Sequence, residues 1–249
     1  MLTGKAKKSD FLNLCREFVD DGRQGEEYIR AHEERLWNIF RVCCDSIPDG
    51  AKIISVGAGS AYIEHALYRF KNADITVVDF PEAIDYHRKY YEKSNFNTIG
   101  CDLSTPWVCE EKFDLALSSS IIQHIPRPPY EHVLMLSALL KKNGKLIINT
   151  PNFANIRNVI RLILMRPIMQ SPEKVFGEVS FENEGVHRRE YVPLEIYDAM
   201  KRCGLRVAEI NYTENKRVES FKDFFFYSFG LLGLKQFWLS MIISATKEA

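Results

Sequence analysis

The sequence predicts an α/β fold in which a largely parallel β-sheet is covered by helices on both faces. Short runs of β-branched residues alternate with helical patterns between residues 51 and 149, and the first run leads directly into a glycine turn, Gly57-Ala58-Gly59. Consecutive parallel strands need a crossover connection, which is usually a helix, so this alternation favours a parallel sheet. The composition, with 46% hydrophobic and 27% charged residues, is that of an ordinary globular chain.

The N-terminal part, residues 1–49, is expected to form a helical cap. Apolar side chains recur at helical spacing within residues 9–47, which predicts one or two helices there; they are Phe11, Leu14, Cys15, Phe18, Tyr28, Ile29, Leu36, Trp37 and Phe40. Pro48-Asp49-Gly50 then supplies the turn chemistry that ends this part.

The central part, residues 50–150, holds the alternating elements. Strands are expected at residues 51–56, 74–79, 97–101, 113–118 and 144–149. Helices are expected at residues 60–71, 82–93 and 130–142, with Asn143-Gly144 interpreted as the stop signal of the last one. Ligands of parallel sheets bind beyond the carboxyl ends of the strands, so the residues that follow each strand are the candidates for a site.

After Pro151 the alternation stops. Residues 151–192 form an insertion with an amphipathic stretch and a polar loop, and residues 193–249 contain a helix at 193–203 and strands at 205–212 and 237–246 that are expected to pair. The strongly aromatic segment 221–234 between these strands is either buried core or an exposed surface for a membrane, a lipid-like substrate or a dimer contact. The four parts are expected to make one domain.

The glycine turn and a downstream acid indicate a nucleoside cofactor. A strand, a glycine turn, a helix and a second strand that ends in Asp79 follow one another. The glycines let the backbone approach a ligand closely, and the acid accepts hydrogen bonds from ribose hydroxyls. A dinucleotide fits less well, because Ala61 stands where a further glycine is typical and no second βαβ half is visible.

Five segments in order resemble the motifs of class I S-adenosylmethionine-dependent methyltransferases: residues 53–61, 77–80, 100–103, 113–125 and 140–148. The resemblance implies a Rossmann-like seven-stranded sheet with the last strand antiparallel, and S-adenosyl-L-methionine as the cofactor. It also implies that the cofactor-binding residues are Ser55, Gly57, Ala58, Gly59, Asp79, Phe80, Asp102, Leu103, Ser118 and Ser119.

Several of these residues have structural alternatives. Asp79 and Asp102 are also suited to cap the helix or turn that follows each of them. Phe80 is also suited to pack in the hydrophobic core. The first motif of the family commonly carries an acid where this chain has Ser55. A serine there offers a hydrogen bond without a charge.

Two histidines are the candidates for chemistry at the acceptor. His124 follows the fourth strand, where an imidazole can take a proton from an acceptor hydroxyl, unless it only bonds backbone in the turn before Pro126. His187 lies in a polar cluster with Arg188 and Arg189, which are expected to bind an anionic substrate or else to be solvated. Tyr28 and His32 are expected in the opposite wall of the substrate site, or in packing.

The expected function is methyl transfer to a small molecule, first of all O-methylation of a sugar or glycan precursor. The alternatives are a quinone-like or other apolar acceptor, and a degenerate module that binds cofactor without catalysis. Zero formal net charge and the lack of a base-gripping motif after Ser118-Ser119-Ser120 argue against nucleic acid. No ligand spacing indicates a metal, the six cysteines are expected to be free thiols, and no segment suggests secretion or a membrane span, so a cytoplasmic enzyme is expected.

Overall fold

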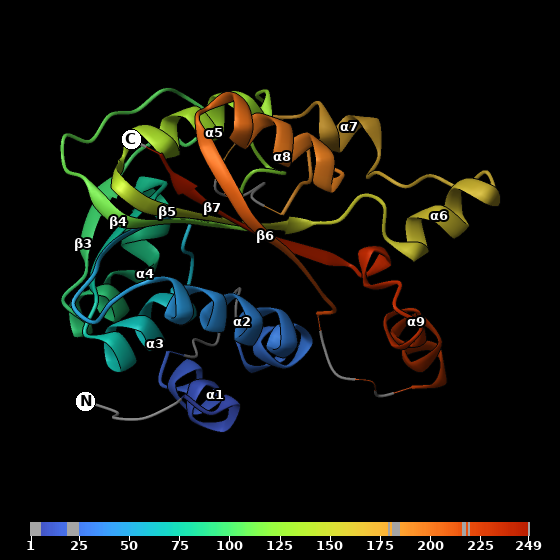
Figure 1. The fold of residues 1–249 in the computed structure, drawn as a ribbon, viewed down its shortest axis with the longest axis horizontal. Coiled ribbons are helices and arrows are strands. Elements are labelled where there is room, and N and C mark those ends of the chain that lie inside the picture. The colour runs from blue at the N-terminus through green and yellow to red at the C-terminus, as the bar shows by residue number, and fades with distance from the viewer. Residues whose placement is uncertain are drawn as a thin grey trace.

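The computed structural model describes residues 6–18, 25–178, 180, 185–215, 218 and 220–248, and within them seven strands form one sheet. The strand order is β3-β2-β1-β4-β5-β7-β6 (Figure 1). The strands are β1 (Lys52–Val56), β2 (Asp74–Asp79), β3 (Asn97–Gly100), β4 (Phe113–Ser119), β5 (Leu140–Pro151), β6 (Leu205–Thr213) and β7 (Ser240–Lys247). The first five pair in parallel, and β7 is antiparallel to both β5 and β6. This confirms the predicted fold class.

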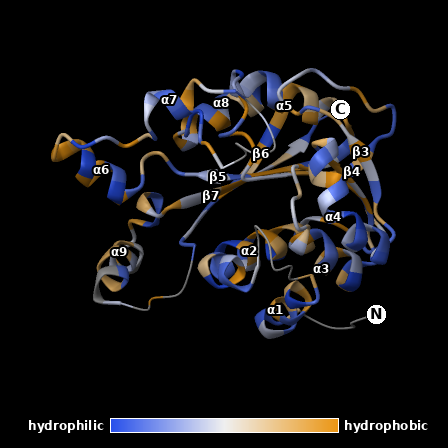
Figure 2. Ribbon diagram, turned by 180° about the vertical axis from the view of Figure 1, so that it is seen from behind, coloured by the Kyte–Doolittle hydropathy of each residue, from blue (hydrophilic) through white to orange (hydrophobic). Residues whose placement is uncertain are grey.

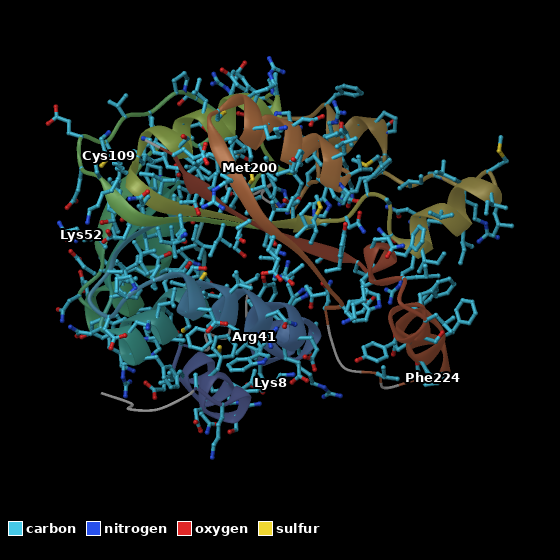
Figure 3. All side chains as sticks on the ribbon, in the orientation of Figure 1. Lys8, Arg41, Lys52, Cys109, Met200 and Phe224 are labelled. Carbon is cyan, nitrogen blue, oxygen red and sulfur yellow. The ribbon has the colours of Figure 1, made fainter. Side chains whose placement is uncertain are left out.

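Helices cover both faces of the sheet because successive strand side chains point to opposite sides. Ile53 packs toward α1 (Lys8–Arg16), α2 (Glu26–Ser46), α3 (Tyr62–Lys71) and α4 (Pro81–Lys93). Ile54 packs toward α5 (Pro129–Ala138) and α8 (Pro193–Arg202). Figure 1 shows these two helical layers on opposite sides of the sheet, and Figure 3 labels Met200, a buried residue of α8.

The N-terminal helices share one core with the sheet. The rings of Phe11 and Phe40 stack with their centroids 4.8 Å apart, and Phe40 also contacts the ring of Phe70 on α3 at 5.5 Å. Both Phe11 and Phe40 are fully buried in the same cluster as Ile53. The cap therefore packs on α3 and shares its core with the sheet.

The predicted end of the helix at residue 142 is wrong, because α5 ends at Ala138 and β5 begins at Leu140. The partner of β4 shifts from Leu140 to Lys145 while β4 advances only from Phe113 to Leu115, so the intervening residues bulge out of the ladder. A Cβ on Gly144 would lie 2.9 Å from the Lys141 carbonyl oxygen, and Asn143 has a φ of 63°. Asn143-Gly144 therefore forms a tight turn within the strand and does not stop a helix.

The insertion and the aromatic segment form helices at one end of the molecule. They are α6 (Ile156–Ile163), α7 (Pro172–Val175) and α9 (Phe221–Leu231), and a 3-10 turn, η2 (Lys235–Phe237), delays the start of β7 to Ser240. Figures 1 and 2 show α6 and α9 at the end of the molecule away from β3, with hydrophobic residues along α6. Phe224 on α9 is half exposed (Figure 3). No helix in the described part of the chain is long and apolar enough to cross a membrane.

Replacing Phe40 by alanine is expected to lower the free energy of unfolding by about 3–5 kcal/mol, because it empties a closed part of the core. Leu134→Ala, on the exposed side of α5, is the control and is expected to change it by no more than about 0.5 kcal/mol. Urea unfolding followed by far-ultraviolet circular dichroism and by tryptophan fluorescence measures both. Separate transitions from the two probes would contradict the prediction of a single domain.

Candidate functional site

A cavity of about 1100 Å³ lies at the carboxyl ends of β1, β2, β4 and β5. It exceeds the roughly 300–1,000 Å³ of a typical ligand pocket, so it has room for a cofactor together with a second molecule. Twelve predicted site residues line it: Tyr28, His32, Gly57, Ala58, Gly59, Asp79, Phe80, Leu103, Ser119, His124, His187 and Arg188. Ser55, Asp102, Ser118 and Arg189 are not among the lining residues.

The glycine turn shapes one wall of this cavity. Gly57 has a φ of +70°, and its N–H donates to the Val78 carbonyl at 2.7 Å. A Cβ at this position would lie 2.0 Å from the Ile121 side chain, so the position requires glycine. The Asp79 carboxylate accepts hydrogen bonds from the N–H groups of Gly59, at 3.2 Å, and Phe80, at 2.8 Å. The acid at the end of β2 therefore also fixes the turn.

Ser55 is buried beneath the turn and donates a hydrogen bond of 2.6 Å to Glu64 Oε1. Glu64 belongs to the first turn of α3, is only 3% exposed and lines the cavity. Burial raises the pKa of its carboxyl to about 7. This acid is not among the predicted site residues, although its place in the first turn of the helix after a glycine turn was a usable signal.

Asp102 and Ser118 have structural partners instead of a place in the cavity wall. Asp102 Oδ1 accepts the Ser104 N–H at 2.8 Å and so closes a turn that presents Leu103 to the cavity. The Ser118 hydroxyl bonds to Nε2 of His132 at 2.9 Å, between the sheet and α5. Because side chains alternate along β4, the next residue, Ser119, faces the cavity.

His124 has both ring nitrogens engaged. Nδ1 lies 2.9 Å from the Val186 carbonyl oxygen, and Nε2 lies 3.0 Å from the side-chain nitrogen of Gln123. We assign the proton to Nδ1, since a carbonyl only accepts, and the Gln123 amide then donates to Nε2. Burial lowers the pKa of His124 to about 4, so the ring is neutral near pH 7.

His187 pairs with an acid. Its Nδ1 lies 2.8 Å from Glu190 Oε1, and its ring packs edge-on against His124 at a centroid distance of 5.0 Å. Both His187 and Glu190 line the cavity. Nε2 of His187 has no partner among the residues that the structure describes. A carboxylate on one ring nitrogen and a vacant lone pair on the other is the arrangement of an oriented base.

The two arginines that follow His187 serve the local fold. The guanidinium of Arg188 donates to backbone carbonyls, at 2.6 Å to both Val175 and Glu178, and so holds the turn after α7. Arg189 forms a surface ion pair with Glu195, with a side chain that is 62% exposed. Their backbone N–H groups both donate to the Gln123 carbonyl, which attaches this loop to the turn after β4.

The opposite wall comes from α2. Tyr28 and His32 lie there with ring centroids 4.5 Å apart, and burial lowers the pKa of His32 to about 4. The guanidinium of Arg35, which sequence analysis missed, donates to Tyr28 Oη at 2.9 Å and to Ser120 Oγ at 2.6 Å. Arg35 is 8% exposed, and its Nε has no hydrogen-bond partner within the described chain.

The model of the methyltransferase domain family matches residues 23–210 of this sequence. Similar solved structures include a methyltransferase in complex with the Trm112 methyltransferase activator of Haloferax volcanii (15% identity, 96% of this chain and 98% of that chain covered, TM-score 0.65). Another is an S-adenosylmethionine-dependent methyltransferase of Mesorhizobium loti (14% identity, 85% of this chain and 97% of that chain covered, TM-score 0.58). A third is the N-methyltransferase NodS of Bradyrhizobium japonicum (12% identity, 86% of this chain and 95% of that chain covered, TM-score 0.55). No curated protein matches the chain. The chain therefore belongs to the methyltransferase domain family.

Proposed function

We propose that the enzyme transfers the methyl group of S-adenosylmethionine to an oxygen of a small acceptor, with His187 as the base. The observation that supports it is the pair formed by His187 Nδ1 and Glu190 at 2.8 Å inside the cavity. An acceptor hydroxyl must lose a proton as its oxygen takes the methyl group, and an oriented imidazole near neutral pH is suited to accept it.

His187 is a better candidate for the base than His124. The lone pair of His124 Nε2 accepts from the Gln123 amide, whose oxygen is held in turn by the Thr150 hydroxyl at 3.1 Å. Proton transfer to His124 would have to break that bond and charge a buried ring. We therefore propose that His124 positions the loop of His187 through the Val186 carbonyl.

The residues that fit the cofactor are those of the glycine wall. Gly57, Ala58 and Gly59 line the cavity, and the glycines let a ligand approach the backbone of this turn closely. We propose that Asp79 accepts the ribose hydroxyls and that Phe80 and Leu103 pack on the adenine. The bound cofactor supplies an electrophilic methyl group on a sulfonium. The protein aligns the acceptor oxygen, receives its proton at His187 Nε2 and stabilises the resulting imidazolium with Glu190.

The far wall supports an acceptor that is polar and anionic at one end and apolar at the other. Arg161 and Arg166 line the cavity from α6 and the residues after it, next to the apolar side chains of Ile160, Leu164 and Phe226. A sugar or glycan precursor that carries an apolar group satisfies both kinds of contact. A purely apolar acceptor such as a quinone makes no use of the two exposed arginines and is the second candidate.

Helix α6 also presents an apolar face outside the cavity. Leu162, Ile163 and Met165 are exposed by 57%, 74% and 92%, and the helix carries arginines but no acid. A basic amphipathic helix of this kind suits the surface of an anionic membrane. We propose that α6, together with the aromatic helix α9, contacts the membrane that carries the acceptor. A dimer contact is the alternative occupant.

His187→Ala is expected to lower kcat by about 10²- to 10⁴-fold, because the acceptor oxygen loses its base. Glu190→Gln should lower kcat less, and the double variant should be no worse than His187→Ala, since both residues act in one step. Transfer of a radiolabelled methyl group to a panel of methyl and octyl glycosides that carry a phosphate or carboxylate group measures these rates. Arg127→Ala, which removes an ion pair with Glu131 in the first turn of α5, is the control. Unchanged turnover in His187→Ala would contradict the assignment of the base.

Replacing Leu162 and Ile163 together by serine is expected to leave KM for methyl and octyl glycosides unchanged, because neither side chain lines the cavity. The same variant should bind vesicles of anionic phospholipid more weakly in a sedimentation assay. Leu134→Ser on α5 is the matched control. If the variant keeps full vesicle binding but changes from dimer to monomer in solution, the surface of α6 binds a second copy of the chain and the membrane contact is contradicted.

A further inference from the structure

The cofactor end of the cavity contains a buried acid that the function proposed above does not use. Glu64 is held by Ser55 from β1 and lies in the first turn of α3, where the helix dipole favours a negative charge. It lines the cavity although the side chain is almost wholly buried. Sequence position 55, where the family commonly has an acid, is thus neutral in this chain, and a carboxyl group from α3 occupies the neighbouring space.

The groups around Glu64 do not neutralise it. Asp79 from β2 is a like charge that raises the pKa of Glu64 further after burial has done so. The thiols of Cys15 from α1 and Cys43 from α2 also interact with it, and burial raises the pKa of both thiols, so they stay uncharged. No cation pairs with Glu64 among the residues that the structure describes. A carboxylate in this position lacks a cationic partner.

Arg35 is a buried cation that lacks an anionic partner among the described residues. Its two terminal nitrogens donate to neutral hydroxyls, those of Tyr28 and Ser120, and its Nε has no partner in the described residues. The described chain provides no carboxylate within ion-pair distance of this guanidinium. A buried guanidinium that makes bonds only to neutral groups is suited to a carboxylate ligand.

We propose that Glu64 and Arg35 together bind the zwitterionic amino-acid end of S-adenosylmethionine, Glu64 its α-ammonium group and Arg35 its α-carboxylate. A carboxylate needs N–H donors, which the ammonium offers and the sulfonium does not. Each protein charge then gains the partner that it lacks in the folded chain. The inference concerns the cofactor and holds for any acceptor.

The proposal predicts proton release on binding. An ammonium beside Glu64 favours the ionised carboxylate and lowers its pKa from about 7. Below that pH the free protein is protonated at Glu64, so binding must expel the proton. The affinity for S-adenosylhomocysteine is therefore expected to rise as the pH increases from the acid side to neutrality and then to level off. Calorimetry in two buffers of different ionisation enthalpy at slightly acidic pH measures the released proton directly.

Three variants and four ligands separate the two roles. Glu64→Gln is expected to lower the affinity for S-adenosylhomocysteine about 10- to 100-fold and to abolish the proton release. The affinity for 5′-methylthioadenosine, which lacks the amino-acid end, should stay unchanged. Arg35→Gln should lower the affinity for S-adenosylmethionine. It should leave the affinity for decarboxylated S-adenosylmethionine unchanged, because that ligand has no carboxylate. Ser55→Asp combined with Glu64→Gln returns an acid to β1 and should restore binding of S-adenosylhomocysteine.

Three results would overturn the inference. The first is a wild-type protein that binds S-adenosylhomocysteine without releasing a proton, which needs no variant. The second is a Glu64→Gln protein that loses affinity equally for S-adenosylhomocysteine and 5′-methylthioadenosine, as expected from a purely structural role. The third is an Arg35→Gln protein that loses affinity equally for S-adenosylmethionine and for decarboxylated S-adenosylmethionine. Turnover does not enter any of these measurements, so failure here is distinct from failure of the proposed acceptor chemistry.

Discussion

The reversal of the chain at Gly57 is the constraint on which the site depends. A left-handed residue without a side chain lets the chain leave β1 and enter α3 within a few residues, and Asp79 locks this turn from the neighbouring strand. The first turn of α3 is thereby placed over the end of β1, with Glu64 directed back to Ser55. Any side chain at residue 57 would meet the Ile121 side chain, which follows β4.

The acceptor wall depends on a second connection, between two loops far apart in the sequence. The Gln123 carbonyl accepts two backbone N–H groups of the loop after the insertion, and His124 binds Val186 from that same loop. These bonds bring the His187–Glu190 pair to the ends of β4 and β5. The residues that hold the loop are therefore as important for the geometry as the residues proposed to act in it.

Local patterns in the sequence predicted most of the fold. The strands, the glycine turn and Asp79 depend on periodicity and turn chemistry over a few residues, and the structure places them as expected. The helix end predicted at Asn143-Gly144 was wrong because the same dipeptide suits both a helix end and a β-bulge. Only the pairing of β5 with Phe113 of β4 distinguishes the two. Glu64, Arg35 and the partner of Ser118 depend on contacts between elements distant in sequence, which a pattern cannot supply.

The place of β7 has a consequence for biosynthesis. This strand lies inside the sheet, between β5 and β6, yet the ribosome makes it after all the other strands. Until β7 emerges, β5 and β6 each present an open row of backbone donors and acceptors, and the nascent sheet can pair with other chains. Cotranslational folding of this enzyme therefore has to wait for its C-terminal strand. Ribosome stalling before residue 240 should leave a nascent chain that depends on chaperones.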